Sequence, residues 1–113
     1  MERITDLTFL NTFAGGNKDK MKKYISMFLQ LCPNSLTNMK TSLESENYDG
    51  LRAAAHALKP QISYMGIKAA EPLIKALEHH ASTKTELDKL PGMLTEFDGL
   101  CRKAMEELAA EIA

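Results

Sequence analysis

Apolar residues recur at steps of three and four along most of the chain, which is the period of an amphipathic helix. The longest such run extends from Met21 to Leu43 and keeps its phase across Pro33. A proline inside a helix removes one backbone hydrogen bond, so we expect a kink at this point rather than an end. Apolar and polar residues nowhere alternate for long enough to indicate a strand. The pattern therefore predicts an all-α protein.

Glycine, proline and clusters of polar residues divide this pattern into separate helices. The expected helices cover about residues 6–13, 18–45, 50–65 and 68–81, and a last one runs from residue 87 or 91 to residue 112. Thr5 is the expected cap of the first helix, and Phe13 is expected on its inner side. Asn17 and Asp49 are the expected caps of the second and third helices. Gly66 is a suitable residue to end the third.

Four amphipathic helices joined by short links favour an up-down-up-down four-helix bundle, with the short additional N-terminal helix packed across one end. The length of 113 residues fits one domain, residues 1–113. A net charge of −1 leaves no basic excess to neutralise phosphates, which argues against nucleic-acid binding. No apolar run approaches the roughly 20 residues of a membrane span, and the N-terminus does not resemble a secretory signal. We therefore expect a monomeric, cytoplasmic protein.

Two cysteines and one pair of histidines are the residues that could form a disulfide or bind a metal. Cys32 and Cys101 each lie in the apolar stripe of an expected helix, so two buried, reduced thiols are the simplest interpretation. Adjacent residues of a helix diverge by about 100°, so His79 and His80 cannot converge on one ion. No cysteine or carboxylate completes a zinc spacing. We expect no metal site.

The third expected helix carries His56 within AAAHALKPQISYMG, residues 53–66. If Leu51 marks the centre of the apolar face, His56 lies about 140° away from it. The ring should therefore point outward, on the side that also carries Arg52, Lys59 and Ser63. A surface histidine without a function is the ordinary alternative to a functional one.

The surroundings of His56 favour a function. Alanines next to it leave room for a macromolecule to approach, and Lys59 lies one turn further along the same surface. The lysine charge favours a neutral, nucleophilic imidazole and would offset the negative charge of a bound anion. Gly66 is expected to leave a gap further along this side, and Tyr64 is expected to be exposed nearby. This combination suits a phosphoryl acceptor.

The stretch AHALKPQISYMG, followed downstream by ALE, resembles the histidine-containing phosphotransfer (HPt) domains of two-component phosphorelays. The family pattern is an alanine–histidine pair, a lysine three residues later, small residues next, a glycine at the tenth position, and often a leucine–glutamate pair on the next helix. The matching residues are Ala55, His56, Lys59, Ser63, Gly66, Leu77 and Glu78. The motif covers about residues 52–78, and the family fold, a four-helix bundle with an N-terminal helical extension, covers the whole chain.

The resemblance implies a phosphorelay intermediate. Such a domain accepts a phosphoryl group on its histidine from a receiver-domain phospho-aspartate and passes it to another receiver. The implied partners are response-regulator receiver domains or a hybrid histidine kinase, and Mg²⁺ is expected in the partner receiver. The chain has no GxxxxGK[ST] loop and no convergent carboxylates, which agrees with a carrier that is not an enzyme and has no cofactor of its own.

Several further residues are expected to belong to this site. Glu78 can reach Nδ1 of His56 from the next helix and leave Nε2 to attack, although a solvated glutamate is equally consistent. Many family members have glycine where this chain has Pro60, and a proline cannot donate to the carbonyl of His56. We expect Pro60 to alter the fit to the partner without abolishing activity. The expected partner-binding residues are Arg52, Pro60, Ser63, Tyr64 and Gly66.

Two other functions remain open from the sequence. One is a helical adaptor that docks response regulators or other partners without being phosphorylated, which Pro60 keeps possible. The other is an enzyme with His56 as general base, for which no second catalytic group is evident.

Overall fold

The computed structural model describes residues 3–113, and its regular elements in this range are all helical. The helices are α1 (Thr8–Phe13), α2 (Lys18–Glu44), α3 (Tyr48–Tyr64), α4 (Glu71–Thr83) and α5 (Leu90–Glu111), with single 3₁₀ turns η1 (Lys68–Ala70) and η2 (Leu87–Lys89). The all-α prediction is therefore confirmed. Helix α2 continues through Pro33, as expected.

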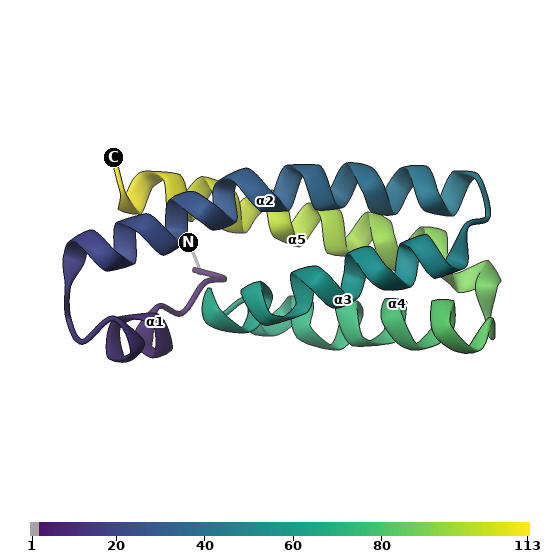
Figure 1. Cartoon of the computed structure of the whole chain (residues 1–113), viewed down its shortest axis with the longest axis horizontal. Coiled ribbons are helices and arrows are strands. Elements are labelled where there is room, and N and C mark those ends of the chain that lie inside the picture. Colours follow the sequence, from purple (N-terminus) through teal and green to yellow (C-terminus); the bar gives the residue numbers. More distant parts are fainter. Residues whose placement is uncertain (1–2) are drawn as a thin grey trace.

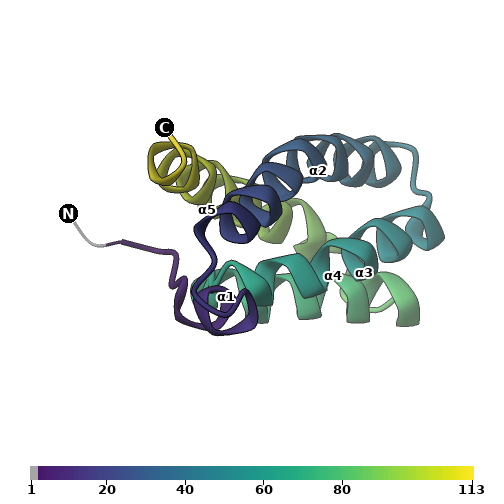
Figure 2. The same ribbon diagram turned by 60° about the vertical axis from the view of Figure 1, so that its left-hand side comes forward.

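Helices α2 to α5 run alternately in opposite directions and form an up-down-up-down bundle (Figure 1). Each helix packs against the next one in the chain, and α5 also packs against α2. Helix α1 lies across the end of the bundle where α2 begins and α3 ends (Figures 1 and 2). This arrangement confirms the predicted architecture. It also places α4 along one side of α3, the helix that carries His56.

The apolar stripes of the four long helices meet in one core. Its largest fully buried side chains include Ile25, Phe28, Leu36, Met39, Leu51, Leu58, Ile62, Ile74 and Phe97. Each such side chain stabilises the fold by about 1.5–3 kcal/mol through burial. None of the helices within residues 3–113 combines the length and the apolar character needed to cross a membrane.

Cys32 of α2 and Cys101 of α5 are both buried in the core and both reduced. A hydrogen bond with Cys32, together with burial, raises the pKa of the Cys101 thiol. A thiol with a raised pKa is unreactive because the thiolate is the nucleophilic form. The prediction of two buried, reduced thiols is confirmed.

Side chains cap the N-termini of α2 and α3. The amide oxygen of Asn17 accepts a hydrogen bond from the backbone N–H of Lys20 at 3.1 Å, which confirms the predicted cap of α2. The prediction that Asp49 caps α3 is wrong. The amide of Asn47 caps this helix instead, by accepting from the backbone N–H of Gly50 at 3.0 Å. Asp49 lies in the first turn, where its negative charge favours the helix dipole.

Gly66 forms the turn that ends helix α3, as predicted, in a Schellman motif. Gly66 has a φ of 63°, and the N–H of Ile67 donates to the carbonyl of Ile62 at 3.1 Å. The N-terminal segment crosses Gly66 so closely that a Cβ atom there would collide with the backbone of Asp6. The N–H of Asp6 donates to the carbonyl oxygens of Met65 at 3.3 Å and Gly66 at 3.2 Å. Gly66 is buried, and the expected gap is filled by the chain itself.

The N-terminal segment is fastened to α5. The backbone N–H groups of Ile4 and Thr5 and the Thr5 hydroxyl donate to the carboxylate of Glu107, at 2.9, 3.0 and 2.7 Å. Desolvation alone would raise the pKa of Glu107, but these hydrogen bonds outweigh it and lower the pKa. The prediction that Thr5 caps α1 is therefore wrong. The Asp6 carboxylate accepts from the N–H of Thr8, the first residue of α1, at 3.0 Å.

The predicted inward orientation of Phe13 is also wrong, because 58% of this residue is exposed. Helix α1 has six residues and lies across the bundle end, so only Leu10 of this helix is buried. Phe13 instead contacts other aromatic rings on the outside of the molecule.

Candidate functional site

His56 lies on the outer face of α3. Ala55 before it and Leu58 after it are fully buried in the core, so the helical turn directs His56 outward. The His56 side chain is 66% exposed. The predicted orientation of the ring is confirmed.

Helix α4 brings a carboxylate to the ring. Nδ1 of His56 lies 2.5 Å from Oε2 of Glu78, whose side chain is only 18% exposed. An ionised carboxylate can only accept hydrogen bonds, so Nδ1 carries the proton. In the neutral ring, Nε2 then has the free electron pair and lies on the side away from Nδ1. Glu78 is therefore in contact with His56, and the alternative of a fully solvated glutamate is wrong.

Lys59 binds the second oxygen of the same carboxylate. Its Nζ lies 2.6 Å from Oε1 of Glu78. This hydrogen bond has the largest effect on the pKa of Glu78, which it lowers. Desolvation acts in the opposite direction, and the hydrogen bond with His56 lowers the pKa further. Glu78 therefore remains ionised at neutral pH and accepts from both neighbours. Lys59 lies one turn after the histidine, as expected, but its ammonium group is bound to Glu78.

A shallow depression of about 390 Å³ lies beside the ring. It is lined by Arg52, His56, Lys75, Glu78, His79 and Ser82. Arg52 was expected at this surface, whereas His79 and Ser82 were not. Lys75, Glu78 or His79, and Ser82 follow one another along α4 at steps of three or four residues. This spacing places them on one face of the helix, and it is the sequence signal by which they could have been found. The site therefore has cationic side chains from both α3 and α4.

The remaining predicted site residues have different environments. Pro60 and Ser63 are exposed on α3, and the Ser63 hydroxyl donates to Glu71 at 2.9 Å. Tyr64 is 37% exposed, as predicted. Gly66 is not part of the exposed surface, because the N-terminal segment covers it. The contact of Gly66 with a partner stays a prediction.

The rings of His79 and His80 form an edge-on pair with centroids 5.4 Å apart. Nδ1 of His80 lies 3.3 Å from the hydroxyl of Thr85. In the described range, no three histidine, cysteine, aspartate or glutamate side chains lie close enough together to hold a metal ion.

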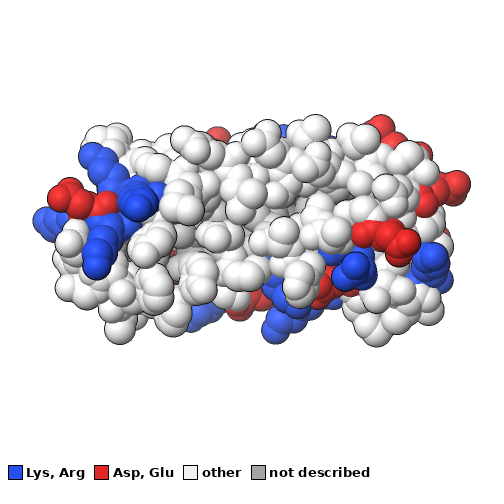
Figure 3. Space-filling view, viewed as in Figure 1, with Lys and Arg blue, Asp and Glu red and all other residues white. Residues whose placement is uncertain are grey.

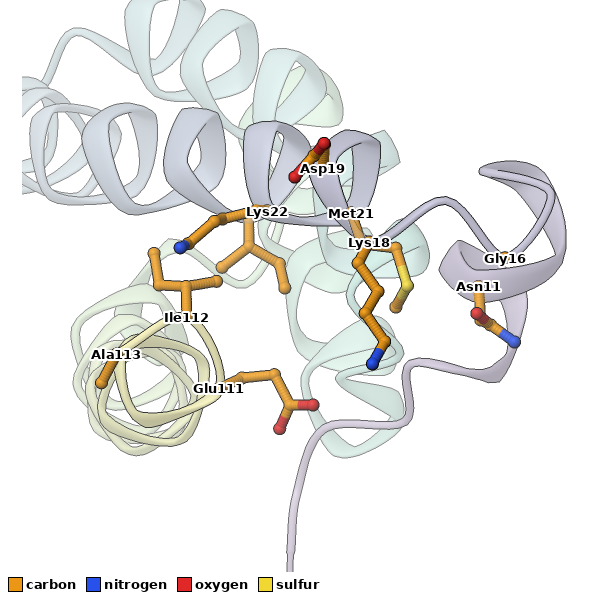
Figure 4. A pocket seen from close by; sticks show the side chains of 10 residues that line it. Asn11, Gly16, Lys18, Asp19, Met21, Lys22, Glu111, Ile112 and Ala113 are labelled. Carbon is orange, nitrogen blue, oxygen red and sulfur yellow. The ribbon is translucent and has the colours of Figure 1, made fainter.

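A hollow of about 510 Å³ lies elsewhere, between the start of α2 and the end of α5 (Figure 4). The Lys18 side chain extends across it toward Glu111. Met21 and Ile112 supply apolar walls. No histidine or cysteine lines this hollow.

The sequence matches the family of the Hpt domain over residues 23–111. This chain is a member of the Hpt domain family. Hpt domains are intermediates that carry a phosphoryl group on histidine in phosphorelays, and their partners are two-component proteins such as receiver domains or kinases. His56, Lys59 and Glu78 lie within the matched segment, whereas α1 lies outside it.

The fold of this Hpt protein is also found in a solved structure. The crystal structure of histidine-containing phosphotransfer protein B (HptB) from Pseudomonas aeruginosa PAO1 matches with a TM-score of 0.87. The match covers 99% of this chain and 96% of the other, at 20% sequence identity. At this identity the likeness establishes the fold alone. A comparison with curated proteins finds no match.

Proposed function

We propose that Nε2 of His56 is the atom that accepts the phosphoryl group from a receiver-domain phospho-aspartate and passes it to a second receiver. The observation that carries this proposal is the exposed ring of His56 with its Nδ1 bound to Glu78 at 2.5 Å. This contact keeps the proton on Nδ1 and leaves the electron pair of Nε2 available.

The transfer step forms one bond and breaks one. The electron pair of Nε2 attacks phosphorus, and the bond between phosphorus and the aspartyl oxygen breaks, so the aspartate leaves as a carboxylate. The imidazole keeps its Nδ1 proton and gains a positive charge. Glu78 offsets this charge because its carboxylate lies directly against Nδ1. The reverse step delivers the phosphoryl group to the second receiver.

Lys59 assists the reaction electrostatically through Glu78. Its ammonium group holds Oε1 at 2.6 Å, which fixes the carboxylate while Oε2 contacts the ring. Arg52 and Lys75 line the depression beside His56 and supply further positive charge toward the dianionic phosphoryl group.

The receiver docks over the outer face of α3. This face is formed by Ala53, three residues before His56, and by Ala57 and Pro60, which lie between His56 and Tyr64. All three are exposed and uncharged. Small side chains let the receiver bring its aspartate close to the ring. On α2, residues 24–39 contain no charged residue. Figure 3 shows the resulting broad uncharged area over α2 and α3. Arg52, Pro60, Ser63 and Tyr64 are the proposed contacts with the receiver.

The division of labour follows from what each partner contributes. This chain supplies the nucleophile and its orientation, and it acts as a phosphoryl carrier rather than as an enzyme. The receiver supplies Mg²⁺ and the remaining catalytic groups. We further propose that residues 1–113 form one domain that acts as a monomer in the cytoplasm.

The test uses a panel of receiver domains phosphorylated with acetyl phosphate. The wild-type protein should become labelled, and the label should be labile in acid and stable in alkali, as expected for phosphorus bound to nitrogen. His56→Gln should abolish labelling. His79→Gln is the matched control, because this histidine lines the same depression, and it should retain the label. Receiver binding without labelling of the wild-type protein would favour the adaptor instead.

A further inference from the structure

The hollow between the start of α2 and the end of α5 lies apart from the site around His56. Its volume is about 510 Å³, and it shares no lining residue with the depression beside the histidine. Met21, Ile25 and Ile112 give it apolar walls. Ile25 is buried, whereas Met21 and Ile112 are half-buried and so accessible to another molecule. We call this hollow the α2–α5 groove. Its volume is in the range of protein sites that bind small ligands.

Lysine side chains border the groove on the side of α2. Lys18 and Lys22 extend from α2 toward the end of α5, whereas Asp19 points the other way (Figure 4). Lys20 and Lys23 lie in the same turns of the helix, and all four lysines are exposed. The segment 18–23 therefore carries four lysines and one aspartate, a net charge of 4 − 1 = +3. Figure 3 shows this positive charge gathered over the start of α2.

The charge of these lysines is not balanced at close range within the described chain. Every salt bridge within residues 3–113 involves another cation. Lys18 extends toward Glu111, but the carboxylate of Glu111 is paired with Arg3 instead, with Nη2 and Oε2 3.2 Å apart. The border of the groove therefore has positive charge that is available to an anionic partner.

This placement of the lysines opposes the stability of α2. Lys18 and Lys20 lie in the first turn, where the positive end of the helix dipole disfavours cations. Lys18 and Lys22 are four residues apart, so their like charges repel one another along the helix. Positions that oppose local stability are expected at functional surfaces.

We infer that the α2–α5 groove is a second docking site, which binds a segment of a partner protein that carries aspartate or glutamate on both sides of an apolar side chain. The carboxylates pair with Lys18 and Lys22, and the apolar side chain contacts Met21 and Ile112. The complementary charges select an acidic segment and speed its association. Docking here does not use the residues around His56. A partner held in this way has a raised effective concentration at the carrier, which is an advantage for a transient exchange.

The test titrates the ¹⁵N-labelled protein with three synthetic peptides and follows its amide signals by NMR. The peptides are EELEELEE, QQLQQLQQ, which lacks the charges, and EESEESEE, which lacks the apolar side chains. We expect EELEELEE to shift the signals of residues 18–25 and 111–113 in a saturable manner and to leave those of residues 52–60 unchanged. The other two peptides should bind about fivefold more weakly or less.

Two double variants separate the groove from a general attraction between opposite charges. Lys18→Gln/Lys22→Gln should weaken the binding of EELEELEE by about fivefold. Lys20→Gln/Lys23→Gln is the matched control, because it removes the same charge from the same segment although neither residue lines the groove. At physiological salt, where exposed charges are screened beyond about 8 Å, its loss should stay below about twofold. Circular dichroism checks that both variants keep the fold.

Several outcomes would overturn the inference. One is an equal loss of affinity in the two double variants, and another is the absence of saturable shifts at millimolar peptide. Binding to phosphatidylglycerol vesicles without binding of the peptide would assign the lysines to a membrane surface instead. The inference does not depend on the proposed phosphoryl acceptor, so His56→Gln should bind EELEELEE as tightly as the wild type. Labelling of His56→Gln in the transfer assay would refute the acceptor and leave this result unaffected.

Discussion

Replacing Glu78 with glutamine keeps the shape of the side chain but changes the hydrogen bonds that it can make. In the wild type, one carboxylate accepts from Nδ1 of His56 at 2.5 Å and from Nζ of Lys59 at 2.6 Å. An amide has one accepting oxygen and one donating nitrogen. The ammonium of Lys59 can only donate, so it retains the amide oxygen. The amide NH₂ group then faces Nδ1 and donates to it, which moves the ring proton to Nε2.

A protonated Nε2 has no free electron pair and cannot attack phosphorus. Hydrogen bonds to charged groups contribute about 1.5–3 kcal/mol. Because 66% of the His56 side chain is exposed to water, we take the lower end of this range. About 1.5 kcal/mol corresponds to roughly a tenfold change. Glu78→Gln should therefore slow transfer from a saturating phosphorylated receiver by about tenfold.

Two measurements check this prediction. Rapid-quench, single-turnover transfer gives the rate, and ¹⁵N NMR of the imidazole at alkaline pH identifies the nitrogen that carries the proton. An unchanged rate, or a proton that remains on Nδ1 in Glu78→Gln, would refute the reasoning.

Adding Lys59→Met to Glu78→Gln makes the test more specific. Without the ammonium group, the amide can turn its oxygen toward Nδ1, and the wild-type tautomer returns. The double variant should therefore transfer faster than Glu78→Gln alone, whereas Lys59→Met by itself should be slower than the wild type. If Lys59 acted directly on the phosphoryl group, the two substitutions would act independently. The fold-losses in transfer rate of Lys59→Met and Glu78→Gln would then multiply in the double variant.

The remaining predictions concern the N-terminal segment. Gly66→Ala should destabilise the protein by more than about 1 kcal/mol, because the residue has a φ of 63° and its Cβ would collide with Asp6. Gly99→Ala is its control: this helical position is open, so stability should rise by about 0.5–1 kcal/mol, and urea unfolding measures both. The pKa of Glu107 is lowered from an ordinary value of 4.5 by its bonds to the N-terminal segment. The contribution of the Glu107 carboxylate to the free energy of unfolding is therefore fully present above pH 4.5 and is lost as the pH falls through the pKa of the folded state. The difference in Tm between the wild type and Glu107→Gln should shrink on going from neutral to strongly acidic pH; a constant difference would contradict this.

The helices and the orientation of His56 could be predicted from the sequence because they depend on local geometry. A residue's angle around a helix follows from its distance along the chain, so the apolar stripe containing Leu51 and Leu58 predicts which side faces the core. The cap at Asn17 and the turn at Gly66 are likewise local, because their partners lie within a few residues.

The N-terminal region could not be predicted in this way. Its interactions join residues far apart in the sequence, such as Thr5 with Glu107. By sequence alone, a threonine before a short helix is a suitable N-cap, and Phe13 is a suitable core residue. The crossing of α1 over the bundle end decides both cases, since it directs Thr5 to α5 and leaves Phe13 outside.

By itself, the sequence determined that a histidine projects from a helical bundle with a lysine one turn later, because helical periodicity carries that information within a few residues. The tertiary structure alone decided that Glu78 binds both side chains. This contact spans 22 residues and depends on how α4 slides and turns against α3, which is set by packing across the whole core. A displacement by one turn would leave Glu78 in solvent, and the ring would have no preferred nitrogen for its proton.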